Sequence, residues 1–177
     1  VSRMISIFEK KHPQREHLNQ KDYDTILFGY NRLGFSILKA LKGLRKKYLI
    51  IDFNPDVISD LKKLNLPAIY GDAYDSEFLN ELPLDKIQMA ISTVPDFETN
   101  LILIKSIRSV NPEAIVISRA SSIDDAFELY RKGSNYVLTP HFLGGEYVSR
   151  MISGSKINKD IYKKEKSKHI KMLEERQ

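Results

Sequence analysis

Two glycines, Gly29 and Gly34, stand five residues apart in a segment whose backbone could hold a phosphate group. The apolar run Thr25–Phe28 precedes them, and apolar residues at helical spacing follow them. A strand, a tight turn and a helix in this order present free N–H groups and a partial positive charge at the turn. Gly29 permits the turn, and Gly34 lets the helix pack closely on the sheet. The dinucleotide-binding fingerprint requires this context.

Asp52 is the second candidate group. It lies 23 residues after Gly29, at the end of the apolar run Tyr48–Asp52. An acidic side chain at this place can accept hydrogen bonds from ribose hydroxyls. It would also repel a 2′-phosphate, so NAD is favoured over NADP. The glycine turn and Asp52 together predict a site for an adenine nucleotide.

Asn31 occupies the middle position of the fingerprint. Glycine is usual there because it lets the backbone approach a pyrophosphate. Asn tolerates a left-handed backbone better than most residues, and its amide could donate to a phosphate. Its side chain nevertheless crowds the groove. The residues therefore leave AMP, ADP and ATP open as ligands beside NAD.

The elements around these residues alternate short β-rich runs with helical patterns. This alternation predicts an α/β domain with a Rossmann-like, doubly wound parallel sheet of about six strands. Strands are expected over 25–28, 48–52, 68–70, 87–92, 114–119 and 136–138. Helices are expected from residue 33, from Pro55, over 76–82 and 96–110, between a cap at Ser122 and a stop at Gly133, and over 140–151.

Further candidates stand at the ends of the other predicted strands, because ligands of open parallel sheets bind beyond the carboxyl ends. Those ends carry Asp72-Ala73, Thr93-Val94 and Arg119-Ala120. Asp72 could face the adenosine half of a nucleotide. Arg119 suits a phosphate partner and equally suits a surface salt bridge. Arg32 suits a phosphate partner and equally suits an exposed position in the first helical turn.

Composition excludes several classes of protein. The chain has 177 residues, of which 42% are hydrophobic and 29% charged, which suits one soluble domain with appendages. It has no cysteine, so disulfides and thiolate metal sites are excluded. No apolar run approaches the roughly 20 residues of a membrane-spanning helix. His12, His17 and His169 lie in the appendages and predict no metal site.

The net charge of +5 comes from the two ends of the chain. Residues 156–177 carry eight Lys and Arg against four Asp and Glu, and residues 1–22 carry five against three. Terminal charge runs are usually solvated, so we expect no nucleic-acid partner. We interpret residues 1–22 as a linker, and residues 154–177 as a basic tail that is helical or disordered.

Four further runs indicate a family. They are IIDFNPD (Ile50–Asp56), IYGDAYD (Ile69–Asp75), AISTVPD (Ala90–Asp96) and TPHFLGGE (Thr139–Glu146). The chain resembles the TrkA-N or RCK domains, which regulate potassium channels, potassium uptake systems and Kef-type cation/proton antiporters. The resemblance covers about residues 23–153, which defines the expected Rossmann domain. We expect no second domain after residue 153, and the resemblance makes residues 1–22 a linker from a preceding membrane region. The chain thus looks most like the cytoplasmic tail of a Kef-type antiporter, with a channel tail as the alternative.

This resemblance implies a regulatory domain at the cytoplasmic face of the cell membrane, binding NAD(H) or AMP, ADP or ATP. It implies a homodimer or higher assembly that gates a membrane transport domain. Gly29, Asn31, Arg32 and Leu33 would line the phosphates, Asp52 would hold the ribose, Asp72 and Ala73 would lie beside the adenosine, and Arg119 would reach the phosphates. The predicted cofactor-binding set is completed by Tyr30, Gly34, Phe53 and Thr93.

An NAD-dependent oxidoreductase is the alternative function. Tyr162 and Lys166 form the Tyr-x-x-x-Lys pair of short-chain dehydrogenases, with Ser149 upstream. Seven of the 22 residues from 156 to 177 are lysine, however, so the pair arises readily by chance. His141 follows Pro140 at a helix start, where a capping or interface role suits it better than that of a base. We therefore expect no enzymatic activity and no catalytic residues.

The segment 96–110 predicts an interface as well as a core helix. Its apolar residues form two stripes at helical spacing, Phe97, Leu101 and Ile104 in one and Leu103, Ile107 and Val110 in the other. One stripe should cover the sheet. The other is expected to pack against a second subunit or beneath the final helix.

Overall fold

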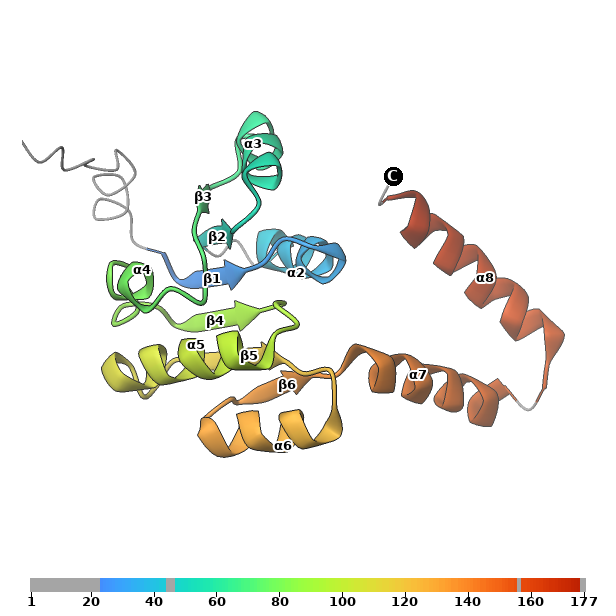
Figure 1. Ribbon diagram of the computed structural model, residues 1–177. Coiled ribbons are helices and arrows are strands. Elements are labelled where there is room, and N and C mark those ends of the chain that lie inside the picture. Colours follow the sequence, from blue (N-terminus) through green and yellow to red (C-terminus); the bar gives the residue numbers. More distant parts are fainter. Residues whose placement is uncertain (1–22, 44–46, 156, 176–177) are drawn as a thin grey trace, which may run out of the picture. The chain divides into compact units, whose positions relative to one another are not determined.

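The computed structural model describes residues 23–43, 47–155 and 157–175 (Figure 1). The linker predicted over residues 1–22 lies outside this part and stays a prediction. The chain divides into two compact units, with the boundary between Leu138 and Thr139. The predicted Rossmann domain, 23–153, therefore takes in the first unit and part of the second.

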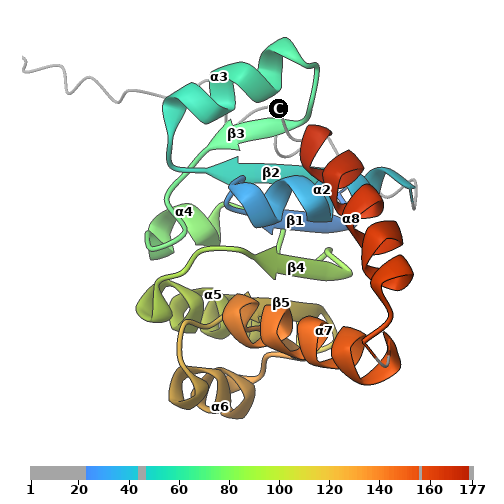
Figure 2. The ribbon, with the colours of Figure 1, turned by 90° about the vertical axis from the view of Figure 1, so that its right-hand side faces the viewer.

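The first unit is a parallel sheet with helices on both faces. Its strands are β1 (Thr25–Phe28), β2 (Tyr48–Asp52), β3 (Ala68–Tyr70), β4 (Met89–Ser92), β5 (Ile115–Arg119) and β6 (Tyr136–Leu138). Its helices are α2 (Arg32–Gly43), α3 (Pro55–Lys63), α4 (Ser76–Asn80), α5 (Phe97–Val110) and α6 (Ile123–Lys132). All strands pair in parallel in the order β3-β2-β1-β4-β5-β6 (Figure 2). The predicted Rossmann-like sheet of six strands is confirmed.

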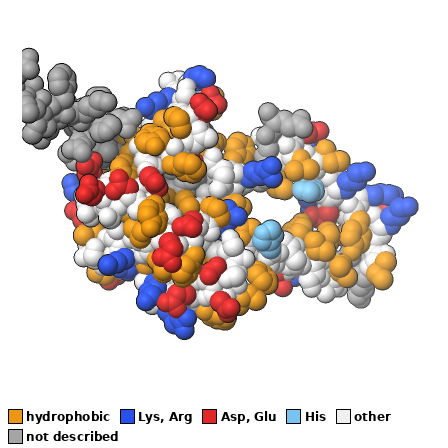
Figure 3. Space-filling model, in the orientation of Figure 1, with side chains coloured by type: hydrophobic (Ala, Val, Ile, Leu, Met, Phe, Trp, Pro, Cys, Tyr) orange, Lys and Arg blue, Asp and Glu red, His pale blue; other side chains and the backbone are white. Residues whose placement is uncertain are grey.

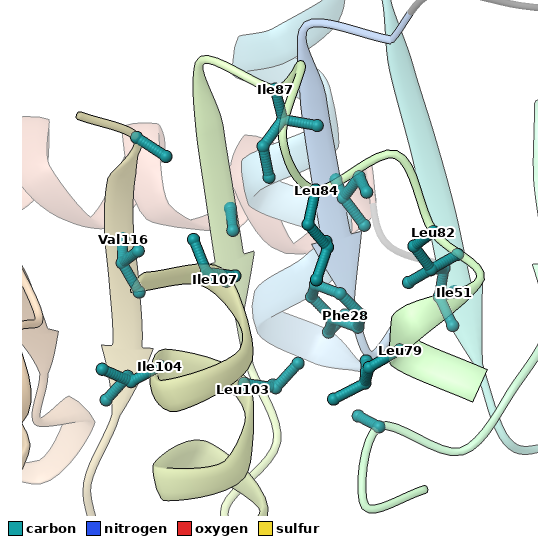
Figure 4. Packing of buried hydrophobic residues seen from close by; sticks show 14 of the residues in the cluster. Phe28, Ile51, Leu79, Leu82, Leu84, Ile87, Leu103, Ile104, Ile107 and Val116 are labelled. Carbon is teal, nitrogen blue, oxygen red and sulfur yellow. The ribbon is translucent and has the colours of Figure 1, made fainter. Parts of the chain in front are cut away.

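Two hydrophobic cores cover the two faces of this sheet. Because successive side chains of a strand point to opposite faces, Phe28 belongs to one core and Leu27 to the other. Phe28 packs on the side of α4 and α5, where Figure 4 shows it among Leu79 and Leu103. Leu27 packs with residues of α2 and α3. Burial on both faces explains why the central strands are continuously apolar in sequence.

Helix ends follow the signals in the sequence. The Ser122 side chain accepts a hydrogen bond from the Asp125 N–H and caps α6. Gly133 ends this helix with φ 114°, a left-handed conformation that favours glycine. Asn54 caps α3 in the same way and stands directly before Pro55 at the first helical position. The predicted cap and stop of α6 are thus confirmed.

Helix α5 buries one broad face. Leu103, Ile104 and Ile107, which come from both predicted stripes, all lie in a single core. The prediction of two separate apolar stripes is therefore wrong, since only Val110 among the second stripe is exposed. Asn100 lies fully buried on the same helix. Periodicity did not predict this, because it treats Asn as a surface residue.

The second unit consists of α7 (Pro140–Ser155) and α8 (Lys159–Glu174). Helix α7 extends four residues beyond the predicted 140–151, and α8 lies within the predicted basic tail. None of the described side chains of either helix is buried. Lys and Arg side chains project from this unit (Figure 3). Among the described helices, none combines the length and the apolar character needed to cross a membrane.

Candidate functional site

A cavity of about 690 Å³ opens in the first unit, where loops follow the carboxyl ends of β1, β2, β3 and β4. This is the edge at which open parallel sheets bind ligands. Predicted site residues that line it are Gly29, Tyr30, Asn31, Asp52, Phe53, Asp72 and Ala73. The other predicted site residues, which are not among its lining, are Arg32, Leu33, Gly34, Thr93 and Arg119.

Asp52 joins the two loops beneath the cavity. Its side chain is 8% exposed, and its Oδ2 accepts a hydrogen bond of 2.6 Å from the Tyr30 N–H. Its Oδ1 accepts one of 2.8 Å from the Asn54 N–H. A carboxylate offers about four lone-pair positions, so two remain for an incoming hydroxyl. Asp52 can therefore fix both loops and still receive a ribose.

Asn31 is a helix cap. Its Oδ1 accepts hydrogen bonds from Leu33 N–H at 2.9 Å and Gly34 N–H at 3.4 Å, and its Nδ2 donates to the Thr93 carbonyl at 3.2 Å. Its backbone is not left-handed, a conformation that the described non-glycine residues show at Asn65 and Ile157. Asn31 therefore does not adopt the left-handed backbone that its residue type tolerates, and its side chain caps the helix start instead. Donation from its amide to a phosphate stays a prediction.

Both glycines of the turn are required by close contacts. Gly29 has φ 84°, and a Cβ there would lie 2.7 Å from Thr93 Oγ1. A Cβ on Gly34 would lie 2.6 Å from the Gly29 carbonyl oxygen. The roles predicted for the two residues, a tight turn and close helix packing, are confirmed by these distances.

Thr93 connects the turn after β1 to Arg119 at the end of β5. It is fully buried at the end of β4, and its hydroxyl donates to the Gly29 carbonyl at 2.9 Å. Its own carbonyl accepts from Asn31 Nδ2 at 3.2 Å and from Arg119 Nη1 at 3.1 Å. Arg119 Nε is buried and has no partner within the described residues. Arg119 thus supports the glycine turn through Thr93, and its reach to a phosphate stays a prediction.

The loop after β4 contributes more residues than the sequence predicted. Val94 stood at a predicted strand end, whereas Pro95, Asp96 and Thr99 were not predicted, and all four line the cavity. Asp96 caps α5, because its Oδ2 accepts from Thr99 N–H at 2.8 Å and from Thr99 Oγ1 at 2.7 Å. These hydrogen bonds lower the pKa of Asp96. The signal was available, since an acidic N-cap follows Pro95 at the carboxyl end of a predicted strand.

Charge in the cavity comes from carboxylates. Asp52, Asp72 and Asp96 line it, and none of the described residues around it is Lys or Arg. The predicted phosphate partners are therefore confined to the turn, the start of α2 and Arg32, and they stay predictions. The wall fits a ribose and a base, which bring hydroxyls and no negative charge. No group of three or more His, Cys, Asp or Glu within the described chain could hold a metal ion.

A second cavity, of about 740 Å³, lies between α7 and α8. Its lining is mainly apolar and includes Met151 and Met172, together with Tyr162 and Lys166 of the dehydrogenase-like pair. The Tyr147 hydroxyl, at its edge, donates to the Glu165 carboxylate at 2.9 Å, which raises the pKa of Tyr147. Tyr162 and Lys166 thus line a cavity of the second unit, whereas Gly29 and Asp52 line that of the first.

Comparison with known proteins identifies the family. A model of the TrkA-N domain matches residues 25–140. The chain belongs to the TrkA-N domain family, as its sequence motifs predicted. It is 28% identical over 138 residues to potassium channel protein 1 of Methanocaldococcus jannaschii, covering 77% of this chain and 40% of that one. It is 24% identical over 151 residues to the glutathione-regulated potassium-efflux system protein KefC of Cronobacter sakazakii, covering 85% and 24%.

Solved structures share the fold. The TrkA-N domain of the inner membrane protein ybaL from Escherichia coli superposes with a TM-score of 0.70 at 20% identity, over 75% of this chain and 98% of that one. The Kef CTD of Shewanella denitrificans in its AMP-bound form gives 0.63 at 16% identity, over 85% and 91%. The GsuK channel bound to NAD gives 0.60 at 18%, over 69% and 22%, and GsuK has also been solved with ADP.

Proposed function

We propose that this chain is the nucleotide-sensing regulatory domain of a potassium transport protein, and that an adenine nucleotide binds in the cavity beside Asp52. The carrying observation is the arrangement of Asp52. Its buried carboxylate holds the glycine turn through Tyr30 N–H and keeps acceptor capacity toward the cavity. NAD(H), AMP, ADP and ATP share the ribose and base that this wall fits, so all remain candidate ligands.

A sensing role follows from the way the cavity is built. Its walls belong to four separate loops. Asp52 bonds Tyr30 N–H of the loop after β1 and, through its carbonyl, Gly71 N–H after β3, and Thr93 bonds the Gly29 carbonyl from the loop after β4. A ligand that bonds the Asp52 carboxylate would weaken or strengthen its hydrogen bonds to Tyr30 N–H and Asn54 N–H. Two nucleotides that differ in their affinity for two loop arrangements would shift the population between them. The signal is proposed to pass to a membrane transport domain, with this domain at the cytoplasmic face.

Two classes of transport protein are candidates for the membrane domain. The relatives include a potassium channel protein and potassium-efflux proteins, and this chain spans less than half of either. We favour the cation/proton antiporter and keep the channel as the alternative. A homodimer, formed at least in part through the exposed apolar side chains of α7, is proposed as the working assembly because none of the side chains described for residues 140–154 is buried.

The proposal includes no catalysis. The cavity contains carboxylates and tyrosines, and burial, followed by the nearby Tyr48, raises the pKa of Tyr30. A phenol whose pKa is raised and a carboxylate engaged by two N–H groups are poorly suited to transfer protons. Turnover of a hydroxy or keto substrate with NADH by the full chain would contradict this view.

Calorimetric titration of the full chain with NAD, NADH, AMP, ADP and ATP tests the function. Asp52→Asn should weaken every ligand that binds by about tenfold or more, because hydrogen bonds to a charged group contribute about 1.5–3 kcal/mol. Asp124→Asn is the matched control, since it removes the same charge from the exposed first turn of α6. Absence of binding by all five ligands to the wild-type chain would overturn the proposal.

A further inference from the structure

Two aromatic side chains that line the cavity are exposed and lie outside the hydrophobic cores. Phe53 is 69% exposed and Tyr74 is 57% exposed, and both line the cavity beside Asp52. Each leaves a large ring in water, although a ring of this size stabilises a protein most when it is buried. Neither ring is part of a core cluster. Their exposure is therefore unexplained by folding.

The backbone at each ring is nevertheless fixed. Asp52 Oδ1 accepts from Asn54 N–H at 2.8 Å, which closes a turn around Phe53. Asp72 Oδ1 accepts from Tyr74 N–H at 2.9 Å, which closes a similar turn ending at Tyr74. Since β2 and β3 are adjacent parallel strands, these turns leave the same edge of the sheet side by side. The backbone at Phe53 and at Tyr74 is thus fixed on neighbouring loops by local hydrogen bonds, while both side chains stay more than half exposed.

We propose that Phe53 and Tyr74 form a stacking clamp for the purine ring of the bound nucleotide. The inference rests on the proposed function and adds the groups that recognise the base. The ring would lie against aromatic faces and against Val57 and Ala73, which also line the cavity. Stacking favours a purine over a pyrimidine because a purine offers a larger aromatic surface. In this arrangement Asp52 binds the ribose, and the turn at Gly29 binds the phosphate.

The test separates the base from the rest of the ligand. AMP, UMP and ribose 5-phosphate are titrated into the full wild-type chain and into Phe53→Ala and Tyr74→Ala. Each variant should bind AMP about five- to thirtyfold more weakly, as removal of one stacked ring does elsewhere. Ribose 5-phosphate should bind both variants as it binds the wild type, and the preference for AMP over UMP should shrink. Tyr74→Phe keeps the ring and should restore AMP binding.

Tyr70→Ala is the matched control. Tyr70 is exposed to a similar degree, 50%, and ends the same strand, β3, but it does not line the cavity. Its removal should leave AMP binding unchanged. The chain has no tryptophan, so Tyr74→Trp supplies a single reporter whose emission AMP should quench and ribose 5-phosphate should not.

Three results would overturn the clamp while leaving the proposed function intact. They are unchanged AMP binding in both alanine variants, an equal loss for AMP and ribose 5-phosphate, and a wild-type chain that binds UMP as tightly as AMP. If neither AMP nor any other adenine nucleotide binds the wild-type chain, the clamp and the proposed function are both wrong.

Discussion

Substitution of Gly29 by Ala should destabilise the fold through two separable effects. The residue has φ 84°, and a left-handed backbone costs an L-residue about 1–2 kcal/mol. The new Cβ would also lie 2.7 Å from Thr93 Oγ1, and overpacking of this kind costs about 1–3 kcal/mol. We therefore expect Gly29→Ala to lower the free energy of unfolding by about 2–5 kcal/mol.

Thr93→Ala separates the two effects. Alone it loses the hydrogen bond from Thr93 Oγ1 to the Gly29 carbonyl, at a cost of about 1 kcal/mol. In the double variant it also removes the atom that the Cβ would strike, while the backbone cost remains. The double variant should therefore be less destabilised than the sum of the single variants, by about 1–3 kcal/mol.

Urea unfolding of the full chain, followed by far-UV circular dichroism, gives the four free energies of this cycle. Thr93→Ser is the control, because it keeps the hydroxyl and should leave the coupling with Gly29→Ala near zero. Strict additivity in the Ala/Ala pair would refute the packing argument. So would an equal coupling in the Ser pair, because the relief would then not come from Oγ1.

Three further substitutions have defined outcomes. Asn100→Leu should cost about 2–4 kcal/mol of stability in urea unfolding, because Nδ2 donates to the carbonyls of Val94, Asp96 and Arg119 from a fully buried position. Asp96→Asn should be destabilised most, relative to wild type, at neutral pH. Because the fold lowers the pKa of Asp96, its carboxylate stabilises the fold above the unfolded pKa near 3.8, and this contribution is lost as pH falls through the folded pKa. In urea unfolding at several pH values, the difference in unfolding free energy between variant and wild type should therefore narrow below about pH 4. Arg119→Gln should weaken AMP more than adenosine in calorimetry if Arg119 reaches the phosphate, and an equal loss would assign it only to supporting the turn at Thr93.

Local patterns predicted most of the first unit. The strand Thr25–Phe28 was predicted because three apolar residues in a row follow Thr25, which suits a strand buried on both faces. Gly133 was predicted as a helix stop because a left-handed cap favours glycine. Asp52 was found because a fixed spacing separates it from the turn. These features depend on neighbours in sequence or on one repeated supersecondary unit, so a single sequence carries enough information to find them.

Features that depend on distant contacts were not predicted. Asn31 Nδ2 donates to the Thr93 carbonyl, 62 residues away, and no local pattern indicates this contact. Asn100 donates to carbonyls of Val94 and Asp96, after β4, and of Arg119, at the end of β5. Tyr74 looked like an ordinary loop residue, since only the adjacency of β2 and β3 brings it to the same cavity as Phe53.

A crystal structure of the full chain grown with AMP tests the central claim most directly. Two cavities of similar size compete for the ligand, about 690 Å³ at the sheet edge and about 740 Å³ between α7 and α8. We predict AMP in the first, with its ribose hydroxyls on the Asp52 carboxylate and its phosphate at the turn after β1. Density for AMP in the cavity between α7 and α8, with the sheet-edge cavity empty, would contradict it.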